Sequence, residues 1–289
     1  MATILETCRV PAPRGAAAEQ SVPLTFFDIH WLHLHPIRQL LFYDYPCSKP
    51  HFLETIAPKL KESLSLSLRH YLPVAGDLIY PLNSEKKPEI RYVAGDSAVS
   101  LTIAESGSDF DVLIGNHARD ADQFYEFVPQ IDPVTDESVC QRVPVMALKV
   151  TLFPGRGICV GFANLHCLGD ASSLAGFIQA WASISKLGGD EEFLTKQGES
   201  LPIVDRVVIK DPLGIDTIFW KVIGEVPLKS SSFPLPTNRV RATYVLRQAD
   251  VKKLKDLVLA KKPGLVQVSS FVVTGVLCVD LLGEIWGAS

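Results

Sequence analysis

The sequence has no clustered positive charge, and this absence removes one large class of partners. Lys and Arg number 28 against 32 Asp and Glu, which gives a formal net charge of −4. No run of Lys or Arg is longer than two residues. Proteins that bind nucleic acids need grouped cations to neutralise phosphates. We therefore expect no nucleic-acid partner.

Paired cysteines and long apolar segments are also missing. None of the six cysteines forms a C-x-x-C pair, so a zinc site or a redox motif is not expected, and scattered cysteines are typical of reduced thiols in the cytosol. The most apolar segment, 269–279, is followed by Asp280 and Glu284 and is shorter than the roughly 20 residues that a bilayer requires. The N-terminus lacks a charged start followed by an apolar stretch, so we expect no signal peptide. These features predict a cytosolic protein with no membrane partner.

Several motifs of other enzyme classes are absent or incomplete. The chain contains neither a G-x-x-x-x-G-K-[S/T] phosphate loop nor a G-x-S-x-G nucleophile elbow. The glycines of 155–161 open a strand pattern instead of a helix, so they do not indicate a dinucleotide loop. His30, His33 and His35 lie close together, but no carboxylate or thiolate completes a ligand set, and we expect no metal. A metal-dependent hydrolase built on these histidines stays as an alternative that bound zinc would support.

The chain of 289 residues is long enough for two modest domains. Alternating apolar residues on both sides of a Pro-Gly turn predict a hairpin, and the apolar spacing of 174–184 predicts a helix that ends at Gly188. Residues 190–216 are charged and predict an interdomain connection. The expected elements are strands 89–93, 99–104, 146–152, 158–162 and 240–246, and helices 51–71 (with a break at Pro58), 174–184, 249–260 and 269–282.

The heptapeptide 164–170, Asn-Leu-His-Cys-Leu-Gly-Asp, lies where the predicted hairpin ends and the helix begins. His166 stands on the strand side, and a neutral imidazole is a suitable base for a hydroxyl group. Asp170 precedes the helix and fits its N-cap. Cys167 adjoins His166, but neighbours in an extended chain point apart, so no Cys–His dyad is expected. By spacing alone, a structural histidine is the more common explanation.

The heptapeptide and its surroundings resemble a known family. Residues 158–173, ICVGFANLHCLGDASS, resemble the H-x-x-x-D signature of the plant BAHD acyltransferases, and their LGDASS ending resembles the clade that malonylates flavonoid and phenolic glycosides. The likeness spans nearly the whole chain, with segments in the expected order: SVPLTFFDIHWL (21–32), LFYDYP (41–46), FLETIAPKLKESLSLSLRHYLPVAGDLIYP (52–81), VDRVVIKDP (204–212), RATYVL, ADVKKLKDLVL and VSSFVVT (268–274).

The resemblance implies an α/β fold of two chloramphenicol acetyltransferase-like domains with mixed sheets and flanking helices, the second domain being incomplete. It implies a first domain over 1–187, a crossover linker over 188–215 and a partial second domain over 216–289. His166 is then the catalytic base in a channel between the domains. Asp170 belongs to the same catalytic motif, with a structural role. The hydroxyl attacks the thioester directly, so no acyl-enzyme is expected.

The implied activity is that of an acyl-CoA-dependent O-acyltransferase that transfers malonyl, or another acyl group, to a sugar hydroxyl of a flavonoid or phenolic glycoside. Acyl-CoA and the glycoside are the partners, no cofactor is bound permanently, and the full-length protein is expected to be a monomer. The family's second signature, Asp-Phe-Gly-Trp-Gly, is absent from the sequence. A truncated, inactive fragment is therefore the alternative.

Two parts of the substrates need cations or amides. Residues 171–174 provide no cation for a malonyl carboxylate, so the likeness alone favours that donor. For the CoA phosphates we expect Lys253, on a Lys-rich helix, and Ser269 and Ser270, which lead into another helix with free amides. The alternative is that these lysines form a solvated helix face.

Overall fold

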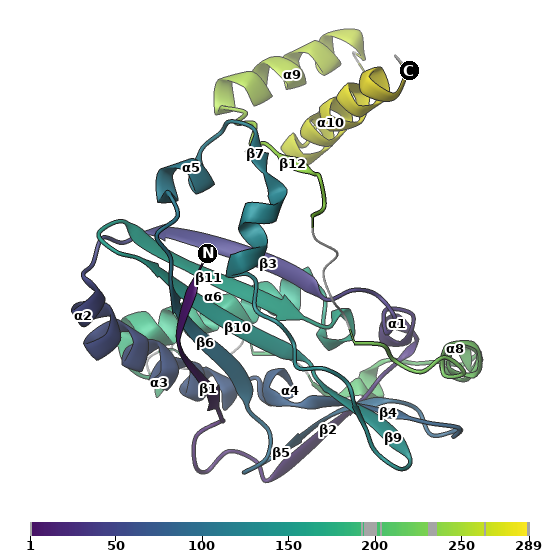
Figure 1. The fold of residues 1–289 in the computed structure, drawn as a ribbon. Coiled ribbons are helices and arrows are strands. Elements are labelled where there is room, and N and C mark those ends of the chain that lie inside the picture. The colour runs from purple at the N-terminus through teal and green to yellow at the C-terminus, as the bar shows by residue number, and fades with distance from the viewer. Residues whose placement is uncertain are drawn as a thin grey trace. The chain divides into compact units, whose positions relative to one another are not determined.

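The computed structural model describes residues 2–191, 193, 201–202, 204–230, 236–262 and 264–287 (Figure 1). The chain forms two compact units. The first comprises residues 1–114 and 120–239, and the second comprises residues 115–119 and 240–289. This division follows contacts within the chain, and the domain boundaries inferred from the resemblance stay a prediction.

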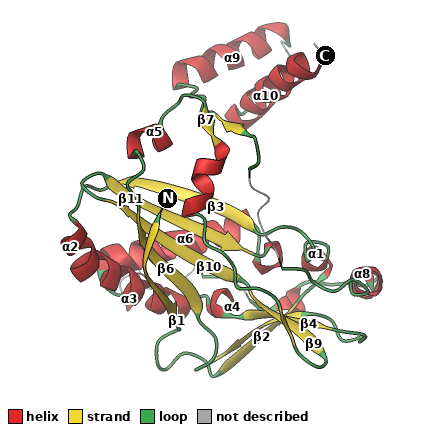
Figure 2. Cartoon of the chain, viewed as in Figure 1, coloured by secondary structure: helices red, strands yellow, loops and turns green. Residues whose placement is uncertain are grey.

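A mixed five-stranded sheet is the centre of the first unit (Figure 2). Its strand order is β1-β6-β10-β11-β3, with β6 and β10 parallel and the other pairs antiparallel. The predicted hairpin is confirmed, because β10 and β11 pair from Met146↔Asn164 to Phe153↔Gly157. The strands are β1 (Thr3–Val10), β3 (Ile37–Asp44), β6 (Val99–Glu105), β10 (Met146–Phe153) and β11 (Gly157–Asn164).

A second, antiparallel sheet has the order β2-β5-β4-β9-β8. The strand predicted over 89–93 is confirmed as β5, and its side chains alternate between buried and half-buried, as expected when one face packs on a core. The strands are β2 (Glu19–Pro23), β4 (Asp77–Pro81), β5 (Glu89–Val93), β8 (Thr135–Asp136) and β9 (Cys140–Pro144).

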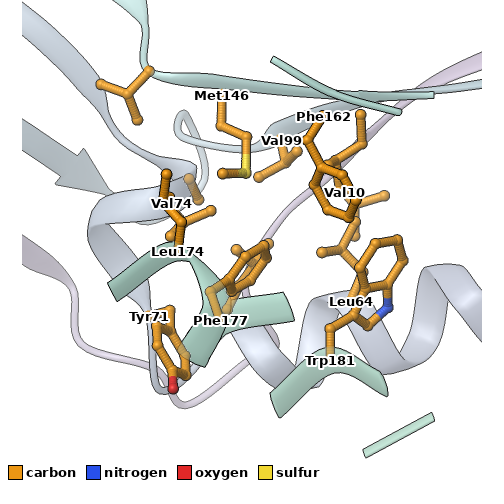
Figure 3. Packing of buried hydrophobic residues seen from close by; sticks show 14 of the residues in the cluster. Val10, Leu64, Tyr71, Val74, Val99, Met146, Phe162, Leu174, Phe177 and Trp181 are labelled. Atoms are coloured by element: carbon orange, nitrogen blue, oxygen red, sulfur yellow. The ribbon is translucent and has the colours of Figure 1, made fainter. Parts of the chain in front are cut away.

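Helix α6 (Ala171–Leu187) packs beside α3 (Ala57–Leu68) and presents its apolar stripe to the first sheet. Figure 3 shows Leu174, Phe177 and Trp181 facing the core. Trp181 also donates from Nε1 to Leu60 O (3.2 Å) and Ser63 Oγ (3.1 Å), which joins the two helices. Gly188 ends α6 at φ +78°, a conformation that favours glycine. The predicted helix and its stop are therefore confirmed.

The predicted break near Pro58 takes the form of a π-helical turn. The helix starts as α2 (Lys49–His51), widens into η1 (Phe52–Ile56) and continues as α3. Proline has no amide hydrogen, and its ring crowds the preceding turn. A wider turn immediately before Pro58 accommodates both effects without ending the helix.

Several short elements of the first unit were not predicted from the sequence. Helix α8 follows the charged segment, and its first amides, those of Ile215 (2.8 Å) and Asp216 (2.9 Å), donate to the Asp211 carboxylate. These elements are α1 (Phe26–Ile29), α4 (Leu72–Ala75), α5 (Phe110–Ile114), η2 (Ala121–Phe127), η3 (His166–Leu168), η5 (Arg206–Val208) and α8 (Ile215–Ile223).

In the second unit, helices α9 (Gln248–Lys261) and α10 (Ser270–Gly287) pack on each other, which confirms both predicted helices. The strand predicted over 240–246 is too long. Only β12 (Val240–Arg241) forms, and it pairs with β7 (Arg119–Asp120). Tyr244 beyond it is 91% exposed, and apolar alternation without a partner strand cannot hold a sheet.

Candidate active site

His166 lies at the point where the chain leaves the first sheet. Strand β11 is buried along its whole length and ends at Asn164, and Leu165 N then donates to Val145 O (2.9 Å). His166 begins the 3₁₀ turn η3, and its side chain is half-buried. A fully buried strand followed at once by a tight turn thus places this imidazole at the edge of the core.

The imidazole of His166 stacks on the indole of Trp31. The ring centroids are 4.2 Å apart and the planes differ by 7°. Trp31 follows α1, and its amide donates to Asp28 O (3.1 Å). Neither α1 nor this stack was predicted, because nothing in 21–32 beyond its likeness to the family indicated a role beside His166.

The turn that carries Trp31 is fixed from both sides. Thr25 donates from its amide (2.9 Å) and its hydroxyl (2.8 Å) to Asp28 Oδ2, so a buried carboxylate closes the start of α1. Ile29 and Leu32, which flank the indole in the chain, are both buried. Asp216, on α8, accepts a hydrogen bond at Oδ1 from the backbone amide of Phe26 (2.5 Å).

His166 and Trp31 line a cavity of about 480 Å³. Its size lies within the range of small-molecule sites, and apolar walls with a few polar groups are typical of such sites. The walls come from α1, α4, β2, β5, η3, the start of α6 and the segment around η5. The polar groups on these walls include Asp28, Tyr71, Asp170, Ser173 and Arg206.

Arg206 is the one arginine or lysine among the described residues that line this cavity. Its guanidinium lies 3.7 Å from Asp28 Oδ1, and its buried Nε has no hydrogen-bond partner among the described residues. From the sequence, only residues 171–174 were expected to face the channel with a cation for malonyl, and they contain none. Arg206 belongs to the segment 204–212 that resembles the family, but nothing local signalled that this segment returns to His166.

Asp170 occupies the predicted N-cap position of α6. Its Oδ1 accepts from Ser173 N (2.8 Å) and Ser173 Oγ (2.7 Å). These hydrogen bonds, of which the one from the backbone amide has the larger effect, hold the pKa of Asp170 below its ordinary value. The carboxylate also borders the cavity, and its role in a reaction stays a prediction.

Cys167 is not placed for nucleophilic chemistry. Its side chain is buried, and burial raises the pKa of its thiol to about 12. A thiol reacts as the thiolate, which this environment disfavours. The burial of Cys167 therefore argues against a Cys–His dyad.

Two of the three neighbouring histidines of 30–35 lie within hydrogen-bond distance of backbone carbonyls. His30 Nδ1 lies 2.9 Å from Phe26 O, and His33 Nε2 lies 3.2 Å from Ile223 O. Among the described residues, no group of three His, Cys, Asp or Glu side chains has the arrangement that a metal ion requires.

Within the described ranges, no helix combines the length and the apolar character of a membrane span.

The residues expected to meet CoA all belong to the second unit. Lys253 is exposed on α9. Ser269 precedes α10 and accepts at Oγ from Val272 N (3.1 Å), and Ser270 is the first residue of that helix. Because His166 belongs to the first unit, their assignment to CoA stays a prediction.

The fold defines the class of protein. The structure is similar to that of vinorine synthase, with a TM-score of 0.61 and 19% sequence identity, over 100% of this chain and 63% of that one. This confirms the expected α/β fold of the chloramphenicol acetyltransferase type, in which the first sheet is mixed and the second antiparallel, and the chain spans only part of that fold.

The sequence comparisons then give the family. The Transferase family matches residues 3–258, and the chain belongs to this family, that of the BAHD acyltransferases. It is 57% identical over 272 residues to malonyl-coenzyme:anthocyanin 5-O-glucoside-6'''-O-malonyltransferase of Salvia splendens, a match that covers 93% of this chain and 58% of the relative. It is 45% identical to phenolic glucoside malonyltransferase 1 of Nicotiana tabacum, over 95% of this chain and 60% of the relative. The chain thus spans less than two thirds of the length of these relatives.

Proposed function

We propose that this chain is the histidine-bearing part of an acyl-CoA-dependent O-acyltransferase. The observation that carries the proposal is a half-buried imidazole, His166, stacked on Trp31 in a cavity of about 480 Å³. The names of the two relatives support malonyl as the acyl group and a sugar hydroxyl of a flavonoid or phenolic glycoside as the acceptor.

The reaction needs one base and no covalent enzyme intermediate. His166 takes the proton of the acceptor hydroxyl while that oxygen attacks the thioester carbonyl. The tetrahedral intermediate collapses, the C–S bond breaks, and the proton passes from the imidazolium to the CoA sulfur. The products are the ester and free CoA. Asp170 holds the start of α6 beside the base and does not exchange a proton.

Arg206 supports a donor that carries a free carboxylate. A guanidinium can pair with a carboxylate through two parallel hydrogen bonds, and such charged bonds are among the strongest in proteins. Arg206 lines the same cavity as His166, and its 3.7 Å separation from Asp28 is longer than a hydrogen bond. Its guanidinium therefore has donors left for a malonyl group.

The CoA phosphates require a second set of groups. Lys253 offers an exposed cation, and the first turn of α10, next to Ser269 and Ser270, offers backbone amides. The competing explanation is that Lys253 belongs to a solvated face of α9. The proposal also includes a cytosolic location, which rests on the sequence features, and a monomeric full-length protein, which rests on the resemblance to the family.

The competing hypothesis is that the chain is a fragment without activity. A single-turnover assay with malonyl-CoA and a flavonoid glucoside separates the two. Formation of the malonyl ester by the chain, and its loss in His166→Ala, supports the transferase. Absence of the ester at high enzyme concentration supports the inactive fragment.

A further inference from the structure

The stack between Trp31 and His166 has the geometry of a cation–π pair. A cation over the face of an indole is attracted within about 6 Å of the ring centroid, and tryptophan is the strongest of the aromatic partners. The two centroids are 4.2 Å apart with nearly parallel planes. A neutral imidazole gains little from this field, whereas an imidazolium gains more.

We propose that Trp31 is a positioning residue that stabilises the charged form of His166 during the reaction. The proposal rests on the proposed function, in which His166 takes the acceptor's proton and becomes an imidazolium. An interaction that strengthens only at that moment lowers the barrier without tightening substrate binding. Because Trp31 covers one ring face, the nitrogens at the ring edge stay available for the acceptor.

The surroundings make Trp31 able to act in this way. Its turn is anchored by the buried Asp28 carboxylate and by the buried side chains of Ile29 and Leu32, so the indole cannot easily follow a moving imidazole. On a fixed support, the stack sets the plane of the His166 ring before substrate arrives. Preorganisation of this kind costs no rearrangement during the reaction.

Other charged or titratable groups also face this pair. The rings of His30 and Trp31 lie 4.3 Å apart between centroids, at an interplanar angle of 45°. Four more such groups line the same cavity: Asp28 on α1, Tyr71 immediately before α4, Asp170 immediately before α6, and Arg206 on η5. A decisive test must therefore separate His166 from His30 and from the two carboxylates.

The first test measures steady-state kinetics of Trp31→Leu and Trp31→Phe in the complete protein, with malonyl-CoA and a flavonoid glucoside. Loss of the cation–π contact should lower kcat by roughly 2- to 30-fold in Trp31→Leu, with both KM values little changed. Trp31→Phe should fall in between, because a phenyl face attracts cations more weakly. Tyr45→Leu, at an exposed aromatic residue outside this cavity, should keep the parent kcat. Thermal melting checks that every variant is folded.

The second test needs no turnover. In a His30→Asn background, we expect the fluorescence of Trp31, taken as the difference from Trp31→Phe, to fall as the solution is acidified, because an imidazolium in contact quenches the indole. The fall should disappear in His166→Asn. A fall that persists in His166→Asn would come from the neighbouring carboxylates, and it would overturn the proposal.

The two tests together separate the possible failures. Quenching by His166 with an unchanged kcat in Trp31→Leu would overturn the catalytic role of the stack. Equal loss of kcat in Trp31→Leu and Trp31→Phe, without quenching, would show a role in packing only and would also overturn it. If His166→Asn keeps the parent kcat, the proposed function itself fails, whatever the fluorescence shows.

Discussion

Replacing Asp170 with alanine removes an N-cap from the 17-residue helix α6. Two hydrogen bonds disappear, from the amide and the hydroxyl of Ser173. An N-cap of this kind contributes about 1 kcal/mol, within a range of roughly 0.5–2 kcal/mol. In a domain of about 150–250 residues, about 1 kcal/mol corresponds to a fall in Tm of roughly 2–4 °C. Thermal unfolding followed by circular dichroism measures this change directly.

Two further variants make this prediction specific. Asp170→Asn keeps an oxygen acceptor and should retain most of the stability, since asparagine is also a good N-cap. Ser172→Ala changes an exposed residue of the same turn and should shift stability by less than about 0.5 kcal/mol. If Asp170→Ala and Asp170→Asn melt alike while only activity falls, the structural role of Asp170 is refuted.

The pH dependence of the same variant gives an independent check. The pKa of Asp170 is lowered in the folded state, so its carboxylate contributes stability that is present above the unfolded pKa of about 3.9. This contribution is lost as the pH falls through the lowered pKa. The difference in Tm between the parent and Asp170→Ala should therefore be full at neutral pH and should shrink below about pH 4. A difference that stays constant down to about pH 2 would contradict the charged cap.

Two predictions concern the acyl donor. Arg206→Met should lower kcat/KM for malonyl-CoA by roughly 10- to 100-fold, because a hydrogen bond to a charged group is lost. The kcat/KM for acetyl-CoA, which has no free carboxylate, should be nearly unaffected. An equal loss with both donors would show that the role of Arg206 is structural. Lys253→Glu should raise the KM for malonyl-CoA and leave the KM of the glycoside unchanged, whereas Lys229→Glu, the same charge reversal at an exposed lysine of the first unit, should change neither. An unchanged KM for malonyl-CoA in Lys253→Glu would show that Lys253 belongs to a solvated face of α9 and does not bind CoA.

The sequence predicted the surroundings of His166 well where the signal was local. The period-2 alternation on both sides of a Pro-Gly turn defined the hairpin β10–β11, and the apolar stripe of 174–184 defined α6. The N-cap at Asp170 follows from one residue type at one position. Each of these features depends on neighbours in the chain, which periodicity and capping rules describe directly.

The parts that were missed depend on contacts between distant segments. Trp31 reaches the cavity of His166 on a short turn after α1, and Arg206 reaches it on a segment 40 residues further along the chain than His166. Neither the turn nor the segment has a periodic apolar pattern. The strand expected over 240–246 failed for the opposite reason, because its alternation was present while only its first two residues found a partner strand. Local patterns do not specify which distant element supplies a partner.

The turnover of His166→Ala in the complete protein, with malonyl-CoA and a flavonoid glucoside as substrates, decides whether His166 is the base. Removal of a general base should lower kcat by roughly 10²- to 10⁴-fold, while the Tm stays close to that of the parent because His166 is only half-buried. A kcat near that of the parent would contradict the assignment of His166, and with it the proposed function.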